Sequence, residues 1–270
     1  MENQLLWHNF YQEINQPDEQ IDLAKASLYY AQVEYPDLDV QKYLNVLDAI
    51  ASEIKPQLPA KLYPLKVIQT INYHLFDCLK FQGNSQDYYN PDNSFLNRVI
   101  ELKTGIPITL SVVYLAIAKR LDFPMVGIGM PGHFLIRPQF ENAGIFVDAF
   151  NRGEILFKQD CQAKLNQIYQ QAKLDPSLLI PVSNKHILAR MLNNLKFIYL
   201  RQQNLDKALA IISGILNLFP ENALEIRDRG LLYYQMNRWH EAVVDLEYFL
   251  KIFPDSKDAP TIKMLLEKMI

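Results

Sequence analysis

An internal repeat near the C-terminus is the feature that most limits how this chain can fold. Like residues recur at an interval of 34 positions, as from 208 to 242, in three pairs: Tyr199 and Tyr233, Ala208 and Ala242, Pro220 and Pro254. A fixed period of this length is typical of repeat proteins, in which each unit buries its apolar face by stacking on the next one. The last third of the chain is therefore predicted to be a short stack of helical units.

These units resemble tetratricopeptide repeats, which have this period, a tyrosine in the first helix, a small alanine in the second and a proline at the end. Alanine at 208 and 242 lets paired helices approach closely, and proline at 220 and 254 closes each unit. An unrelated helical bundle is the alternative. The repeat predicts helices over about 188–202, 206–218, 222–236 and 240–252, and a last helix over about 259–269 that covers the exposed apolar end.

The part of the chain that precedes the repeats is rich in glycine. Seven of the nine glycines lie between residues 83 and 153, and glycine permits tight turns and close backbone approach. This part predicts a helix over 107–121 and strands over 125–129, 134–137 and 145–148. Three helices are predicted before it: one over 17–33, one capped by Asp37 or Asp39, and one over about 65–79.

The predicted fold class is α+β: a domain at 1–180 with a helical part (1–80) and an α/β core (81–160), then an all-α repeat domain at 186–270. The segment 179–183 is the predicted join. Because it is short and apolar, Leu-Ile-Pro-Val among its residues, it does not suit a free linker. We therefore expect the two parts to pack together.

Composition and charge exclude several classes of function. The formal net charge is −3 and no run of Lys or Arg stands out, which argues against a nucleic-acid partner. No stretch approaches the roughly 20 apolar residues that span a bilayer, and the N-terminus has no secretory signal pattern. Cys78 and Cys161 lack the spacing of a zinc site. The expectation is a cytoplasmic protein without a metal or cofactor and with no membrane partner.

Two residues of the glycine-rich part carry a resemblance to known enzymes. His133 lies in a Gly-His-Phe motif and Asp148 in a Val-Asp-Ala-Phe motif. The segment around them resembles the transglutaminase-like superfamily, in which a cysteine begins a helix, a histidine lies on the next strand and an aspartate on the strand after. The resemblance implies a transglutaminase/papain-like fold and a hydrogen bond from the His133 ring to Asp148.

A narrower resemblance covers almost the whole chain. The stretches at 81–84, 90–97, 104–110 and 131–135, followed by the repeats, are similar to the SirB family, in which a transglutaminase-like domain precedes tetratricopeptide repeats. The resemblance implies the fold more firmly than an activity, because one fold carries many functions.

The cysteine of the superfamily has no counterpart at the expected place. Pro107 occupies it, and proline has no nucleophilic atom. The sequence therefore predicts a catalytically silent cleft in a protein-binding or scaffold protein with a protein or peptide partner. The alternative is a hydrolase or acyl-transferase that still uses His133 and Asp148. In that case Thr109 or Ser111 replaces the lost thiol.

Further candidates lie in and after the turn-rich stretch at 90–97. Asn93, Arg98 and Glu101 either serve the local structure only or line the cleft beside His133. The predicted binding cleft is composed of these three residues together with Pro107 and His133.

Overall fold

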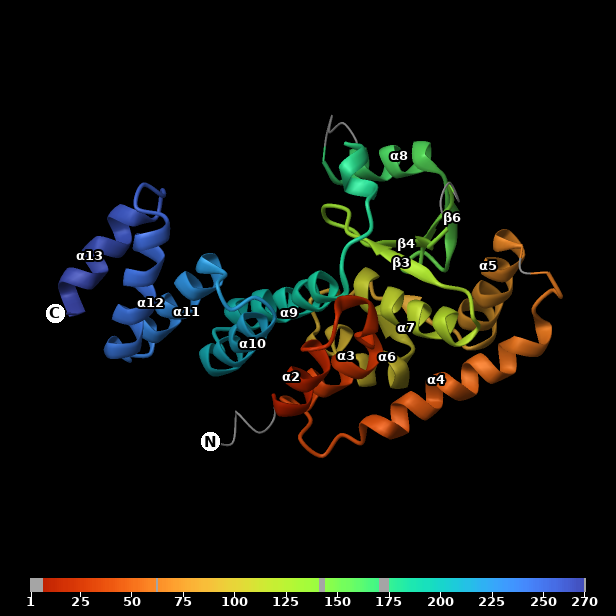
Figure 1. Cartoon of the computed structure of the whole chain (residues 1–270), viewed down its shortest axis with the longest axis horizontal. Coiled ribbons are helices and arrows are strands. Elements are labelled where there is room, and N and C mark those ends of the chain that lie inside the picture. The colour runs from red at the N-terminus through yellow and green to blue at the C-terminus, as the bar shows by residue number, and fades with distance from the viewer. Residues whose placement is uncertain (1–6, 62, 141–143, 170–174, 270) are drawn as a thin grey trace. The chain divides into compact units, whose positions relative to one another are not determined.

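The computed structural model describes residues 7–61, 63–140, 144–169 and 175–269 (Figure 1). The chain divides into two compact units, Met1–Met191 and Leu192–Ile270. The division falls inside one helix, α9 (Asn184–Arg201), whereas the sequence places it earlier, between residues 180 and 186. The segment at 176–182 lies with the first unit, since Pro181 forms an antiparallel bridge with Ile128 and Val182 N donates to Gly127 O.

The first unit is a helical part followed by a small sheet. Its helices are α2 (His8–Ile14), α3 (Leu23–Ala31), α4 (Val40–Ile54), α5 (Pro64–Asn72), α6 (Leu96–Leu102), α7 (Pro107–Arg120) and α8 (Lys158–Ile168), with short helical turns at Asp18–Gln20, Lys55–Gln57, Pro91–Ser94 and Pro176–Leu179 and a π-helix at Tyr73–Cys78. Its strands are β1 (Gln82–Gly83), β2 (Thr104–Gly105), β3 (Met125–Ile128), β4 (Leu135–Pro138), β5 (Phe146–Asp148) and β6 (Glu154–Leu156).

Helix α7 forms the centre of the first unit. Every residue from Pro107 to Ala118 is buried, as expected of a helix that is apolar all round. Proline suits its first position, where the backbone N–H has no intrahelical acceptor. The sequence prediction of a helix over 107–121 is therefore confirmed to within one residue.

The four-stranded sheet has an apolar core on one of its faces. Strands β3, β4, β5 and β6 are neighbours in that order and pair antiparallel. Figure 1 shows α7 on one side of this sheet and α8 on the other. The core on the α8 side contains residues from the sheet, from the loop after β3 and from α8: Ile128, Met130, Leu135, Phe146, Leu156, Cys161 and Leu165.

Two sequence predictions in the helical part need correction. The helix expected over 17–33 is a short turn followed by α3, because the Asp22 side chain accepts the Lys25 backbone N–H at 3.0 Å and so caps a new helix. The helix expected over 65–79 ends as an α-helix at Asn72 and continues as the π-helix. The sequence predicts neither β6 nor α8.

The second unit contains the repeats. Its elements are the end of α9, then α10 (Leu205–Leu218), α11 (Ala223–Gln235), α12 (Trp239–Ile252) and α13 (Ala259–Met269). These bounds confirm the helices predicted from the 34-residue spacing. Pro220 and Pro254 both lie in the turn that follows a helix. At Gly230 in α11, an added Cβ would lie 2.9 Å from the Leu246 side chain of α12, so glycine permits the close approach of these helices.

Substitution of the repeat alanines tests this packing. Ala208 and Ala242 are fully buried, so Ala208→Leu or Ala242→Leu is expected to lower the free energy of unfolding of the second unit by about 1–3 kcal/mol. Ala210→Leu, at a half-buried position of the same helix α10, is the matched control. Thermal denaturation followed by circular dichroism measures the difference. Melting of all three variants at the parent temperature would contradict the assigned repeat register.

Candidate functional site

The His–Asp contact predicted from the sequence is present. His133 lies in the turn before β4, next to Gly132 with φ +68°, and Asp148 is the last residue of β5. The distance between His133 Nε2 and Asp148 Oδ2 is 2.8 Å. The Asp148 side chain is fully buried and that of His133 is 11% exposed. A small part of the His133 side chain therefore remains accessible, whereas the Asp148 side chain is inaccessible to solvent.

Four more donors hold the Asp148 carboxylate. The backbone N–H groups of Phe150 and Asn151 donate to Oδ1 at 3.1 and 3.2 Å. The Asn151 side chain donates to Oδ2 at 2.8 Å, and Lys164 Nζ lies 2.9 Å from the same oxygen. Burial alone would raise the pKa of Asp148, but His133, Lys164 and Asn151 together hold this pKa well below its usual range. Asp148 is therefore a fixed anion.

This depressed pKa predicts how stability depends on pH. A carboxyl whose native pKa is lowered contributes stability that is complete above its unfolded pKa, 3.8, and is lost as the pH falls toward the native value. We expect the first unit to lose stability steeply below pH 3.8 and the Asp148→Asn variant to lose it less steeply. Urea unfolding at a series of pH values measures both slopes. Equal slopes would contradict the assigned role of the carboxylate.

The turn after Asp148 is fixed from a distant helix. Gly153 N donates to Asp148 O at 2.9 Å, and the Asn72 side chain at the end of α5 donates to Gly153 O at 2.7 Å. Tyr114 of α7 in turn donates its hydroxyl to Asn72 Oδ1 at 3.1 Å. Sequence reasoning missed Asn72, and it missed Lys164 and Asn151 as partners of Asp148. Only the turn-forming Asn-Arg-Gly run at 151–153 signals this arrangement.

The start of α7 lies close to the pair through Phe150. Strands β1 and β2 pair in parallel just before α7, with Gly83 opposite Gly105. An added Cβ at Gly83 would lie 2.6 Å from the Phe150 ring, and this ring makes an edge contact with the His133 ring at 6.2 Å between centroids. Tyr88 packs on the same Phe150 ring at 6.2 Å. Aromatic side chains therefore form one wall beside His133.

The hydroxyl groups proposed as replacement nucleophiles do not bond to His133. The Thr109 hydroxyl donates to Asn93 O at 2.7 Å and accepts the Ile106 N–H at 3.1 Å, so it caps the start of α7. The Ser111 hydroxyl is fully buried and has no hydrogen-bond partner among the residues that the structure describes. The enzyme alternative therefore lacks the contact on which it depends.

Asn93 supports the aromatic wall. Its side chain is buried and donates to the backbone carbonyls of Asp87 and Tyr88 at 2.7 and 3.2 Å. It also accepts from the Asn84 side chain at 3.1 Å. The amide therefore shapes the loop that carries Tyr88.

Arg98 and Glu101 lie in a different hollow, of about 250 Å³, with Tyr35 and Tyr43. Arg98 pairs with Glu101 and, at 3.3 Å, with Asp92. Tyr43 donates to Glu101, and burial together with this bond raises the pKa of Tyr43 to about 12. No described contact joins Arg98 or Glu101 to His133, so the structure does not bring these two sequence candidates to the pair.

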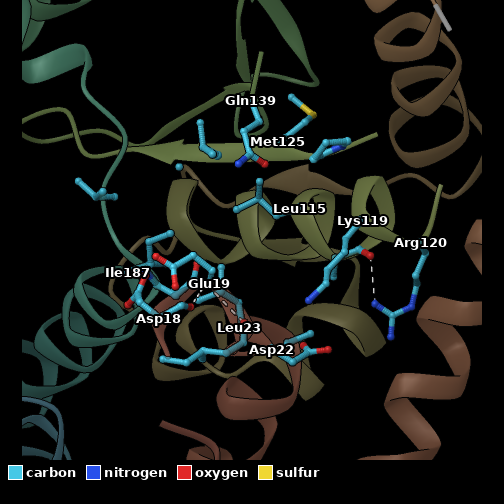
Figure 2. Close-up of a pocket in the computed structure, with 18 residues that line it drawn as sticks. Asp18, Glu19, Asp22, Leu23, Leu115, Lys119, Arg120, Met125, Gln139 and Ile187 are labelled. Carbon is cyan, nitrogen blue, oxygen red and sulfur yellow. Dashed lines mark hydrogen bonds between the residues drawn. The ribbon is translucent and has the colours of Figure 1, made fainter. Parts of the chain in front are cut away.

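A further hollow of about 280 Å³ lies between α3, the second half of α7 and β3 (Figure 2). Figure 2 shows Leu115 between Gln139 on one side and Leu23 on the other. Lys119 lies at the exposed rim. Neither His133 nor Asp148 lines this hollow, which is therefore separate from the pair.

The described residues give no sign of a metal site or of a membrane span. No group of three or more His, Cys, Asp or Glu side chains there is placed to hold a metal ion. No described helix is both long enough and apolar enough to cross a bilayer. Cys161 is buried, and burial raises the pKa of its thiol to about 11, which makes it a poor nucleophile.

Comparison with known families gives two matches that together extend from residue 41 to residue 267. A model described as the transglutaminase-like superfamily matches residues 41–193, and a model described as tetratricopeptide repeat matches residues 195–267. No solved structure matches the chain.

Comparison with curated proteins gives relatives from bacteria and animals. A UPF0162 protein of Xylella fastidiosa (strain Temecula1) is 32% identical over 263 residues, which covers 96% of this chain and 92% of the relative. A UPF0162 protein of Vibrio cholerae is 33% identical over 185 residues, 68% of each chain. F-box only protein 21 of Homo sapiens is 31% identical over 188 residues, 65% of this chain but 29% of that protein.

Proposed function

The chain belongs to the transglutaminase-like superfamily and to the UPF0162 proteins, and from this membership we propose that it is a protein-binding scaffold with a catalytically silent cleft. The cleft at His133 and Asp148 holds a segment of a protein or peptide partner without cutting it. The tetratricopeptide repeats offer a second binding surface. The proposal includes a cytoplasmic location and neither nucleic acid nor membrane as a partner.

The absence of a nucleophile at the start of α7 supports the proposal that the cleft is catalytically silent. Acyl transfer in the superfamily needs a thiolate aimed at a carbonyl, and a helix N-terminus supplies its position and part of its acidity. We assign that place to Pro107, the first residue of α7. Proline offers no atom that could form a covalent intermediate.

One observation carries the proposal: the His–Asp pair is complete, yet no nucleophilic side chain bonds to His133 among the described residues. Burial of the charged Asp148 carboxylate costs free energy. The contacts of this carboxylate with Lys164, Asn151 and two backbone N–H groups offset the cost. A partly exposed imidazole beside aromatic rings suits the recognition of a peptide, whose carbonyl and N–H groups need partners.

A hydrolase or acyl-transferase is the second candidate. One observation favours it: the Ser111 hydroxyl has no partner among the described residues, and Ser111 lies one turn after Pro107 on the same helix face. Full burial of Ser111 argues against it, because a substrate carbonyl cannot reach the hydroxyl unless the start of α7 moves.

A turnover assay separates the two functions. The purified chain is incubated with glutamine-amide and peptide substrates, with and without alkylation of Cys78 and Cys161. No turnover above that of buffer is the expected result. Turnover that survives alkylation and is lost in both His133→Ala and Ser111→Ala would overturn the scaffold proposal in favour of a serine nucleophile. Loss in Thr109→Ala rather than Ser111→Ala would favour the threonine.

A further inference from the structure

Arg190 is hydrogen-bonded to the backbone of the turn that carries His133. It lies on the part of α9 that belongs to the first unit. Its Nη2 donates to the backbone carbonyls of Met130 and His133 at 2.8 and 2.7 Å. The guanidinium carbon lies 5.5 Å from the centre of the Phe134 ring. These contacts fix both the guanidinium plane and the position of the turn.

This cation has no carboxylate partner among the residues that the structure describes. The charged or titratable groups that act on Arg190 are the Tyr88 and Tyr169 hydroxyls, and burial lowers the pKa of Arg190. Arg190 is half-buried, and a cation that is partly withdrawn from water is normally paired, because loss of hydration is costly without a counter-charge. By contrast, Arg98, Arg120, Arg152, Arg227, Arg229 and Arg238 each pair with an aspartate or glutamate.

The donors of Arg190 are only partly used. A guanidinium has five N–H groups in a planar fork. Nη2 is occupied by the two carbonyls, whereas Nε and Nη1 have no acceptor among the described residues. The Nε–H and Nη1–H groups point to different sides of the guanidinium, so each can donate one charge-assisted hydrogen bond to a carboxylate oxygen.

Aromatic and apolar side chains surround the same turn. The Phe150 ring contacts that of His133, and Tyr88 contacts Phe150. On the other flank, an added Cβ at Gly132 would lie 2.8 Å from Ile168 and 3.7 Å from the Tyr169 ring. A ligand at Arg190 would therefore meet one cation and several ring faces.

We propose that Arg190 binds the terminal carboxylate of a peptide whose last side chain is aromatic or apolar and packs against Tyr88 and Phe150. The proposal rests on the binding function proposed above and names the part of the partner that enters the cleft. A C-terminal residue brings its carboxylate and its side chain to adjacent positions, so one residue satisfies both the cation and the rings. An internal Asp or Glu brings the carboxylate alone.

Small probes test this inference on the full-length chain. NMR titrations of the ¹⁵N-labelled protein compare N-acetylphenylalanine with its amide and with the amide of N-acetylaspartate, which has a side-chain carboxylate only. We expect N-acetylphenylalanine to shift the Arg190 Nε–H signal and the amides of His133 and Phe150. We expect each of the other probes to bind at least about tenfold more weakly, because one lacks the charge and the other lacks the ring.

Variants locate the effect. Arg190→Gln is expected to remove the preference for the acid over its amide, whereas Lys119→Gln, which removes a cation from the separate hollow of Figure 2, is expected to keep it. If Arg190→Gln fails to fold, the comparison of acid and amide on the unaltered chain still decides. Equal binding of acid and amide, no binding of either, or loss of the preference in Lys119→Gln would each overturn the inference.

Equal binding of the aspartate probe would overturn the assignment to a C-terminus. These outcomes differ from failure of the proposed function. The scaffold proposal fails if the chain turns substrates over or if partner capture does not depend on His133, and neither result is read from the probe titrations.

Discussion

Asp148→Ala is expected to lower the free energy of unfolding of the first unit by about 3–5 kcal/mol. The carboxylate is fully buried and is the shared acceptor for His133, Lys164 and Asn151. The Lys164 ammonium is 17% exposed and pairs with Asp148 and Glu154. Removal of the Asp148 carboxylate leaves it without the more buried of these two partners. The backbone N–H groups of Phe150 and Asn151, which donate to Oδ1, also lose their acceptor. A buried N–H group without a hydrogen-bond partner lowers the stability further.

Glu154→Ala is the matched control for this prediction. Glu154 lies 2.9 Å from the same Lys164 Nζ but is 49% exposed, so its loss is expected to cost no more than about 1 kcal/mol. Trp239→Phe makes a suitable background, because it leaves buried Trp7 in the first unit as the only tryptophan. Urea unfolding followed by Trp7 fluorescence measures both variants. Equal effects of the two substitutions would contradict the importance of burial at Asp148.

Gly153→Ala is expected to cost about 2–5 kcal/mol, because two penalties coincide. The residue has φ +75°, a conformation that costs an L-residue with a side chain roughly 1–2 kcal/mol. An added Cβ would lie 2.2 Å from Asn72 Oδ1, and such overpacking costs roughly a further 1–3 kcal/mol. The same substitution displaces the turn after Asp148, so we also expect weaker binding in the cleft.

A double-mutant cycle with Asn72→Ala separates these penalties. Asn72→Ala alone loses the hydrogen bond to Gly153 O, about 1 kcal/mol. In the double variant the steric clash is absent but the backbone strain remains, so we expect it to be more stable than the sum of the single effects predicts. Urea unfolding of the four proteins gives the coupling energy. Simple additivity would show that the Asn72 side chain does not crowd position 153.

The parts of the fold that the sequence predicted are those with local or periodic signals. The spacing of Ala208, Ala242, Pro220 and Pro254 predicted the repeat helices. The apolar run after Pro107 predicted α7, because a continuous apolar stretch of that length suits a buried helix. The contact between His133 and Asp148 followed from a resemblance to a family, since neither spacing nor composition brings the two residues together.

The remaining parts depend on contacts between residues far apart in the chain. Asn72 and Lys164 act on the Asp148 turn from α5 and α8, and no local pattern signals either role. The sequence allows Arg98 and Glu101 two roles, in the local structure or in the cleft beside His133. Their own ion pair lies in another hollow and supports the first role. Arg190 was missed because a single arginine in a helix has no distinctive pattern.

The mass of a captured partner most directly tests the claim that the cleft binds without cutting. The full-length chain captures proteins from a lysate of the native cells, and the intact mass of each partner is measured before and after incubation with the purified chain. We predict an unchanged mass. We also predict capture weakened by about 2 kcal/mol in His133→Ala and normal capture by Lys119→Gln. A partner whose mass falls with the parent chain, but not with His133→Ala, would show that the site cleaves its ligand and would contradict the claim.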